Sequence, residues 1–217
     1  MSGEKKTPLH VRLRIKRHRE IARLQDILVE NIFSACPGAV LHGGTAIWRC
    51  YGGNRFSEDV DFYLEKKAGK IDRLFERMKS FGMEVLKKKV GENSLYSVLR
   101  FERTEIRCEA VFKKVKGTLR DYEEYDGNLI SVYTLTPEEL VGEKVDAYLK
   151  RRKIRDLYDI FHLVKFVEEK SAVVANLKKL IEEFVTPVDE EDLRALVLFG
   201  VVPNYDEIME YLERWIK

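Results

Sequence analysis

A glycine pair between an apolar segment and a helical pattern constrains this chain more than any other feature of its sequence. Residues 39–41 (AVL) are short and apolar, which is typical of a buried strand. Gly43 and Gly44 interrupt this segment, and residues 45–51 resume with a pattern typical of a short helix. We therefore expect a strand, a glycine turn and a helix in direct succession.

The glycine turn has a chemical use as well as a structural one. Gly43 and Gly44 can adopt backbone conformations closed to other residues, and they let a phosphate approach the main chain. The helix that follows offers unpaired amides and the positive end of its dipole to an anion. The hydroxyl of Thr45 is placed to add a further contact.

Two aspartates follow the turn by about 15 residues. Asp59 directly precedes a predicted strand over residues 60–64, and Asp61 lies within that strand. Residues two apart on a strand share a face, with Cα atoms separated by about 6.6 Å. Such a pair suits one or two Mg²⁺ ions, and a two-metal site can stabilise the attacking and leaving oxygens of phosphoryl transfer.

A third carboxylate is expected near this pair. Glu109 is the best candidate because it lies among apolar residues on a predicted strand over residues 105–112, where an unpaired charge is costly. Glu105 and Glu102 stay open as substitutes. A purely structural interpretation also exists, since a glycine pair is commonly only a turn and alternating aspartates commonly mark a solvated strand end.

The remaining pattern predicts a mixed α/β half followed by a helical half. Helices are expected at residues 14–34 and 71–81, and further strands at 83–90, 95–102 and 129–133. Thr136 and Pro137 read as the start of a helix, and the rest of the chain has a helical pattern. We divide the chain into a catalytic core with an N-terminal helix at residues 1–135 and a helical subdomain packed on it at residues 136–217.

Composition narrows the class of protein. At 217 residues and 45% hydrophobic, the chain can bury a substantial core. It lacks an apolar run of about 18 residues, so we expect no membrane span and a cytoplasmic location. Its three cysteines form no CxxC pair and are expected to be reduced and mostly buried. Basic residues gather at positions 1–20 and 150–153, which indicates either contact with RNA phosphates or solvated surface.

Taken together, these motifs resemble the nucleotidyltransferase superfamily and, within it, the AbiEii-type proteins of abortive-infection and toxin-antitoxin systems. The matching segments are LHGGTAI at residues 41–47, RFSEDVD at 55–61, EK at 143–144 and RDLYD at 155–159. The resemblance implies a nucleotidyltransferase-type mixed sheet flanked by helices, followed by a C-terminal helical subdomain.

Roles for individual residues follow from the same resemblance. It implies that Gly43, Gly44 and Thr45 bind the triphosphate of an NTP and that Asp59 and Asp61 bind the metals. Glu109 is carried over as the third metal carboxylate on a shorter local match. Three further groups take implied roles: Arg55 and Ser57 organise the loop before the aspartates, Lys144 reaches a nucleotide phosphate, and Asp156 supports the site.

The expected reaction is transfer of a nucleoside monophosphate from an NTP to an acceptor hydroxyl, with Mg²⁺ as cofactor. The resemblance points to a tRNA or other RNA end, or to a protein hydroxyl, and to a toxin that an antitoxin protein neutralises. A small-molecule acceptor stays open. Two rival interpretations are a nucleotide-binding module of the same fold without turnover and a basic RNA-binding protein without catalysis.

Overall fold

A computed structural model describes residues 7–66 and 69–217 of the chain. Their contacts divide into two compact units. The sheet unit comprises Met1–Cys50 and Ser57–Thr134, and the helical unit comprises Tyr51–Phe56 and Leu135–Lys217. Lys5 and Lys6 of the basic N-terminal segment lie outside the described residues.

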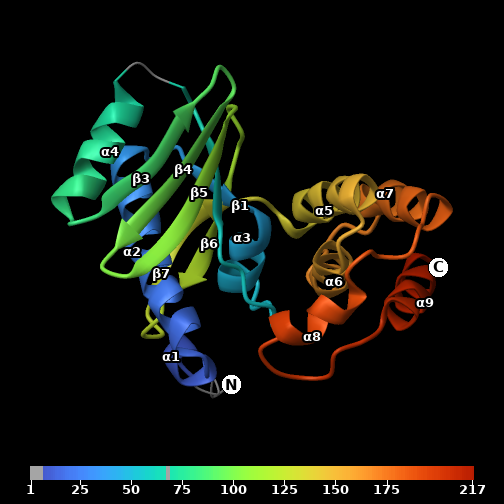
Figure 1. The fold of residues 1–217 in the computed structure, drawn as a ribbon. Helices are drawn as coiled ribbons and strands as arrows, with labels where there is room; N and C mark the ends of the chain where they lie inside the picture. The colour runs from blue at the N-terminus through green and yellow to red at the C-terminus, as the bar shows by residue number, and fades with distance from the viewer. Residues whose placement is uncertain (1–6, 67–68) are drawn as a thin grey trace, which may run out of the picture. The chain divides into compact units, whose positions relative to one another are not determined.

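Within the described residues, the sheet unit contains one seven-stranded sheet and four helices (Figure 1). The strands are β1 Val40–His42, β2 Val60–Leu64, β3 Glu84–Val90, β4 Ser94–Phe101, β5 Thr104–Phe112, β6 Thr118–Glu123 and β7 Leu129–Thr134. Its helices are α1 Leu9–Arg12, α2 Lys16–Ala35, α3 Gly43–Cys50 and α4 Lys70–Ser80. The strand order is β3-β4-β5-β2-β1-β7-β6. The β2–β5 and β1–β7 pairs are parallel and the other pairs antiparallel, so the sheet is mixed as expected.

One face of the sheet carries the hydrophobic core. Helices α2 and α4 cover this face (Figure 1). Every second residue of the central strands, including Val60, Phe62 and Cys108, is buried in the same cluster as the apolar residues of these helices. Leu28 of α2 and Phe75 of α4 belong to the same cluster. The intervening residues of each strand point to the opposite face because side chains alternate along a strand. That opposite face therefore receives the polar residues of β2 and β5.

The helical unit begins where the sequence indicated a helix start. Its elements are α5 Pro137–Arg151, α6 Ile154–Leu163, α7 Ser171–Glu182, a 3₁₀ turn η1 Glu190–Asp192, α8 Leu193–Leu196 and α9 Tyr205–Ile216. Thr136 caps α5 with its hydroxyl, and the Glu139 side chain accepts a hydrogen bond from the Thr136 amide. This reciprocal capping satisfies amides that a helix end otherwise leaves unpaired.

The segment Tyr51–Phe56 is held within the helical unit although it follows α3 in the chain. The Tyr51 hydroxyl donates to the Leu135 carbonyl at 2.5 Å, and the Phe56 amide donates to the Leu196 carbonyl at 2.9 Å. The division at residue 135 drawn from the sequence placed this segment with the core, and only its three-dimensional contacts reveal the association.

The observed elements agree with some sequence expectations and differ from others. The strand at residues 60–64 has the expected bounds, whereas β6 was missed and residues 197–204 are irregular rather than helical. Cys36 and Cys108 are buried and Cys50 is partly buried, and all three are free thiols. Among the described residues, no helix has the length and apolar character required to cross a membrane.

Candidate active site

The turn between β1 and α3 brings glycine against a carboxylate. Gly43 has a φ of +71°, a left-handed conformation that other residues adopt only at a cost. A Cβ atom added there would lie 2.5 Å from Oδ2 of Asp61, much closer than two such atoms can approach. Glycine at this position therefore allows both the backbone turn and the placement of the Asp61 side chain.

Strand pairing places a second carboxylate beside Asp61. Asp61 of β2 pairs with His42 of β1 on one side and with Glu109 of β5 on the other. Residues paired across strands project to the same face, so Asp61 and Glu109 are neighbours on the face opposite the core. Asp59, two residues before Asp61, directly precedes β2. All three acidic residues are partly exposed.

Register also separates the three candidates for the third carboxylate. Glu109 is the residue of β5 that pairs with Asp61. Glu105 lies at the other end of β5, opposite Arg100, and Glu102 lies in the turn between β4 and β5. The structure therefore brings Glu109 to Asp61 and places Glu105 and Glu102 farther along the strands.

An arginine that the sequence interpretation missed contacts the first aspartate. The Arg107 Nε atom lies 3.3 Å from Oδ1 of Asp59, and the two side chains are 48% and 28% exposed. An ion pair this open to water adds little to folding stability. It can therefore exchange for other partners at little cost, which suits a carboxylate that has to accept a ligand.

Two buried polar side chains fix the segment that leads to the aspartates. Thr45 is fully buried, and its hydroxyl donates to the backbone carbonyl of Asp59 at 2.5 Å. Gln25 of α2 is also fully buried, and its Nε2 donates to the Ser57 carbonyl at 2.7 Å. Because the Thr45 hydroxyl already donates its proton to this carbonyl, the structure shows no contact of Thr45 that prepares it for a phosphate. Its contact with a phosphate stays a prediction.

Gln25 was not recognised from sequence as a residue of the site. The available signal was a polar residue among the apolar positions of a helix, since Gln25 follows Ile21 by four residues and precedes Leu28 by three on the buried stripe of α2. A buried polar group requires a hydrogen-bond partner, and Nε2 of Gln25 finds its partners in the carbonyls of Ser57 and Glu58, in the loop before Asp59.

The remaining predicted residues form a buried network in the helical unit. Arg55 donates from Nε and Nη2 to the two carboxylate oxygens of Asp159, at 2.8 and 2.7 Å. Lys144 Nζ lies 2.7 Å from Oδ2 of Asp159 and 3.4 Å from Oδ1 of Asp156. Arg151 binds both oxygens of Asp156 at 2.7 Å. Except for Arg151, each of these side chains is at least nine-tenths buried.

The electrostatics of this network favour the ionised form of Asp159. Burial alone would raise the pKa of Asp159, but the charges of Arg55 and Lys144 outweigh it and lower that pKa to about 2. Burial would lower the pKa of Arg55, and Asp159 reverses this effect and raises it. The pair is therefore fully charged at neutral pH and ties the segment Tyr51–Phe56 to α6.

This arrangement gives Lys144 and the basic cluster local partners. The expected contact of Lys144 with a nucleotide phosphate stays a prediction, since its ammonium group is bound by two carboxylates of the helical unit. In the cluster at residues 150–153, Arg152 donates to the Thr186 carbonyl and Lys153 lies 3.4 Å from Asp189. These contacts favour a structural role for that cluster.

The donor set on β2 and β5 fits a hard divalent cation. Mg²⁺ prefers carboxylate oxygens, and it normally takes one or two from the protein and completes its shell with water and substrate phosphates. Asp59, Asp61 and Glu109 supply such oxygens on one face. Within residues 7–66 and 69–217, no group of three or more acidic, histidine or cysteine side chains is arranged to hold a metal ion. The fit thus rests on the aspartate pair, with Glu109 in register beside it.

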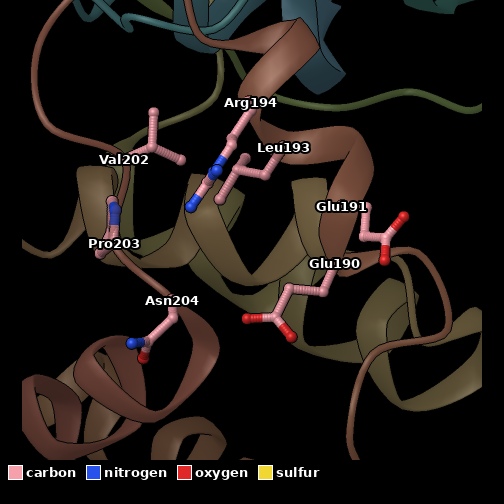
Figure 2. Close-up of a pocket in the computed structure, with 7 residues that line it drawn as sticks. All are labelled: Glu190, Glu191, Leu193, Arg194, Val202, Pro203 and Asn204. Carbon is pink, nitrogen blue, oxygen red and sulfur yellow. The ribbon is translucent and has the colours of Figure 1, made fainter.

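A hollow in the helical unit contains none of the predicted residues (Figure 2). Its volume is about 480 Å³, and it is lined by η1 and α8 on one side and by residues 202–204 on the other. Glu190 in its wall accepts a long hydrogen bond of 3.4 Å from the Tyr205 amide at the start of α9. Neither the glycine turn nor the aspartate pair contributes to this hollow, so we do not identify it with the candidate active site.

Comparison with known proteins gives one family match and several similar solved structures. The family model described as nucleotidyl transferase AbiEii toxin, type IV toxin-antitoxin system, matches residues 26–205. The structure is similar to that of JHP933 from Helicobacter pylori, with a TM-score of 0.66, 22% identity, and coverage of 93% of this chain and 91% of that one.

A second structure has the same fold. It is MenT4, a nucleotidyltransferase toxin from Mycobacterium tuberculosis, with a TM-score of 0.65, 17% identity, and coverage of 92% of this chain and 84% of that one. No curated protein matches the sequence. At these identities the two structures establish the fold, and the family match covers both the glycine turn and the aspartates.

Proposed function

This chain belongs to the nucleotidyl transferase AbiEii toxin family, and from that premise we propose that it transfers a nucleoside monophosphate from an NTP to the hydroxyl of an RNA end, with Mg²⁺ as cofactor. Nucleotidyl transfer in general follows from the family; the metal, the acceptor and the residue roles are our proposal. The observation that carries it is the position of Asp61, which lies against the Gly43 turn and pairs with Glu109.

The reaction is an in-line displacement without a covalent enzyme intermediate. The acceptor oxygen forms a bond to the α-phosphorus, the bond from that phosphorus to the bridging oxygen breaks, and pyrophosphate leaves. The hydroxyl proton passes to solvent. Such a reaction depends mainly on positioning and on stabilisation of developing charge, which preorganised groups supply.

Each candidate site residue of the sheet unit has a distinct role in the proposed reaction. The left-handed turn at Gly43 and the first amides of α3, beginning with Gly44, receive the triphosphate. Asp59 and Asp61 hold Mg²⁺, and Glu109 is the third carboxylate. When bound, the metal would neutralise phosphate charge and stabilise the attacking and leaving oxygens. Thr45 positions Asp59 through the hydrogen bond from its hydroxyl to the Asp59 carbonyl.

Residues of the helical unit take positioning roles. Arg55 holds the chain two residues before Ser57, and it does so through its paired hydrogen bonds to Asp159. Lys144 and Asp156 extend the same network, and in the proposed enzyme Lys144 also contacts a nucleotide phosphate. Ser57 begins the short connection to Asp59, with its carbonyl held by Gln25.

The acceptor and the biological setting are further parts of the proposal. An RNA end, including that of a tRNA, is preferred; protein and small-molecule hydroxyls are the alternatives. Transfer to such an acceptor would make the chain a toxin, acting in the cytoplasm and countered by an antitoxin protein. The rival is a nucleotide-binding module without turnover, and the retention of both aspartates beside the glycine turn speaks against it.

The test offers the protein all three acceptor classes. Purified protein is incubated with Mg²⁺ and each α-labelled NTP in turn, with total RNA, a protein extract or an aminoglycoside as acceptor. We expect label in RNA from one NTP. The double variant Asp59→Asn/Asp61→Asn, with its fold verified by circular dichroism, should give none. Label only in protein or in the small molecule would refute the proposed acceptor, and NTP binding without any product would favour the inactive module.

A further inference from the structure

A run of three lysines on β3 is divided between the two faces of the sheet. Lys88 Nζ donates to Oδ1 of Asp72 at 2.9 Å, so Lys88 lies on the face covered by α4. Lys87 and Lys89 therefore project to the other face, because side chains alternate along a strand. Both are exposed.

A β-bulge produces this division. The pairing of β3 with β4 shifts register between Val85 and Lys87, with Leu86 as the extra residue. Val85 packs against the core, and without the bulge Lys87, two residues later, would share its face. Bulges redirect side chains in this way and are frequent beside active sites. The bulge thus places two cations on the face that carries the aspartates.

Strand register connects these lysines with the carboxylates in two parallel rows. In the first row, Lys87 pairs with Val98, Val98 pairs with Arg107, and the Arg107 side chain contacts Asp59. Each residue of a row lies beside the next on the same face of the sheet. The row therefore runs from the edge strand to the first aspartate.

The second row lies beside the first and ends at the second aspartate. Lys89 pairs with Tyr96, Tyr96 with Glu109, and Glu109 with Asp61. With neighbouring strands about 4.8 Å apart, three strand spacings separate the lysines from the carboxylates by about 14 Å. We call Lys87, Lys89, Tyr96, Val98 and Arg107 the outer sheet face.

The chemistry of the outer sheet face matches a polyanion that carries flat bases. Lys87 and Lys89 supply exposed positive charge at the edge strand, and Arg107 supplies a third charge beside Asp59. Tyr96 is partly exposed between them, with Lys87 Nζ 5.1 Å from its ring centroid. A basic groove with an aromatic ring on which a base can stack is the general solution for single-stranded nucleic acid.

We propose that the outer sheet face binds the last nucleotides of a single-stranded RNA acceptor and leads its terminal hydroxyl to Asp59 and Asp61. This inference rests on the proposed function and names the path of its acceptor. The upstream phosphates contact Lys87 and Lys89, a base stacks on Tyr96, and Arg107 offsets the repulsion between the RNA phosphates and the carboxylates. An acidic protein would use the lysines but would have no need of a stacking platform.

The experiment measures binding of a 5′-fluorescein-labelled, 12-nucleotide single-stranded RNA by anisotropy over a series of salt concentrations. The test variant is Lys87→Gln/Lys89→Gln. Its matched control is Lys79→Gln/Lys88→Gln, which removes the same charge from α4 and from the other face of β3. Tyr96→Leu tests stacking, and circular dichroism verifies each fold.

The two double variants are expected to differ. Each phosphate contact with single-stranded nucleic acid contributes about 0.7 to the slope of log K against log salt, so loss of two lysines should flatten the slope by about 1.4. The control should retain the wild-type slope, and Tyr96→Leu should weaken binding with its slope unchanged. No binding by the wild type, or equal slopes for both double variants, would overturn the inference. Self-association of the test variant with unchanged RNA binding would instead assign the lysines to protection of the sheet edge.

Transfer assays separate failure of this inference from failure of the proposed function. If the wild type labels RNA and Lys87→Gln/Lys89→Gln labels limiting RNA at the same rate, the function stands and the binding surface is wrong. If no variant labels any acceptor while anisotropy shows the expected differences, the surface stands and the proposed function is wrong.

Discussion

Replacing Gly43 with alanine tests the contact between the glycine turn and Asp61, and the chain offers a closely matched control. Gly43 and Gly69 have φ values of +71° and +72°. An added Cβ atom would lie 2.5 Å from Oδ2 of Asp61 at the first position and would meet nothing within 4 Å at the second. Both substitutions therefore carry the same backbone strain, and only Gly43→Ala displaces the carboxylate.

The expected change in Tm follows from the backbone strain, and the expected change in rate follows from the displacement of Asp61. A left-handed conformation costs a non-glycine residue about 1–2 kcal/mol. In a chain of this size, each kcal/mol lowers Tm by about 2–4 °C, so both variants should melt roughly 2–8 °C below the wild type. Relief of the clash at Gly43 requires Asp61 to move by on the order of 1 Å, and a displacement of that size can lower a rate by about 100-fold.

The assay combines thermal melting with the rate of label transfer from an α-labelled NTP. We expect Gly69→Ala to retain wild-type activity with a reduced Tm, and Gly43→Ala to lose about 100-fold in kcat/KM at a similar Tm. If Gly43→Ala is as active as Gly69→Ala, the contact between the turn and Asp61 has no part in catalysis.

Three further perturbations test other parts of the site. Thr45→Val removes the hydroxyl that binds the Asp59 carbonyl; we expect a loss of about 1 kcal/mol in urea unfolding and a lower kcat, and unchanged kcat would count against a positioning role. The pKa of Asp159 is lowered to about 2, so the stability that it contributes is complete above its ordinary pKa near 4 and is lost as the pH falls through 2. The free energy of unfolding of the wild type should fall by about 2 kcal/mol over that window because of this residue. Asp159→Asn should lack this component and be less stable at pH 7 by about 3–5 kcal/mol, because it leaves Arg55 underpaired; equal stability of the two proteins at pH 7 would contradict the network. Burial raises the pKa of Cys108 to about 12, so its alkylation by iodoacetamide at pH 8 should be at least about 10³-fold slower than in urea, and fast labelling of the folded protein would contradict that environment.

The sequence predicted those elements whose pattern is local. Residues 60–64 (VDFYL) are mostly hydrophobic, and they form β2 with the expected bounds, alternating between buried and partly buried positions. The strand β6 was missed because its sequence, TLRDYE, is mostly polar and lacks a clear alternation. Its residues pair with β7 through backbone hydrogen bonds, which do not depend on side-chain hydrophobicity.

Long-range contacts explain what could not be predicted. Arg55 and Asp159 are 104 residues apart in the chain, so their paired hydrogen bonds leave no local signal. The contact between Arg107 and Asp59 depends on the register of β2 with β5, and the placement of Lys87 depends on a bulge. Spacing predicted that Asp59 and Asp61 share a face, whereas the approach of Asp61 to Gly43 depends on the pairing of β1 with β2.

The role of Asp61 in a metal-dependent transfer site can be measured directly. Single-turnover transfer from an α-labelled NTP is compared for wild type, Asp61→Asn and Asp72→Asn, with Mg²⁺ and with excess EDTA. Asp72 is an exposed acid of α4 paired with Lys88, so its variant makes the same change of charge away from the site. We predict that Asp72→Asn matches the wild type, that EDTA abolishes transfer, and that Asp61→Asn is at least 100-fold slower in Mg²⁺. Transfer by Asp61→Asn at the wild-type rate, or transfer that persists in EDTA, would show that Asp61 does not hold a catalytic metal ion.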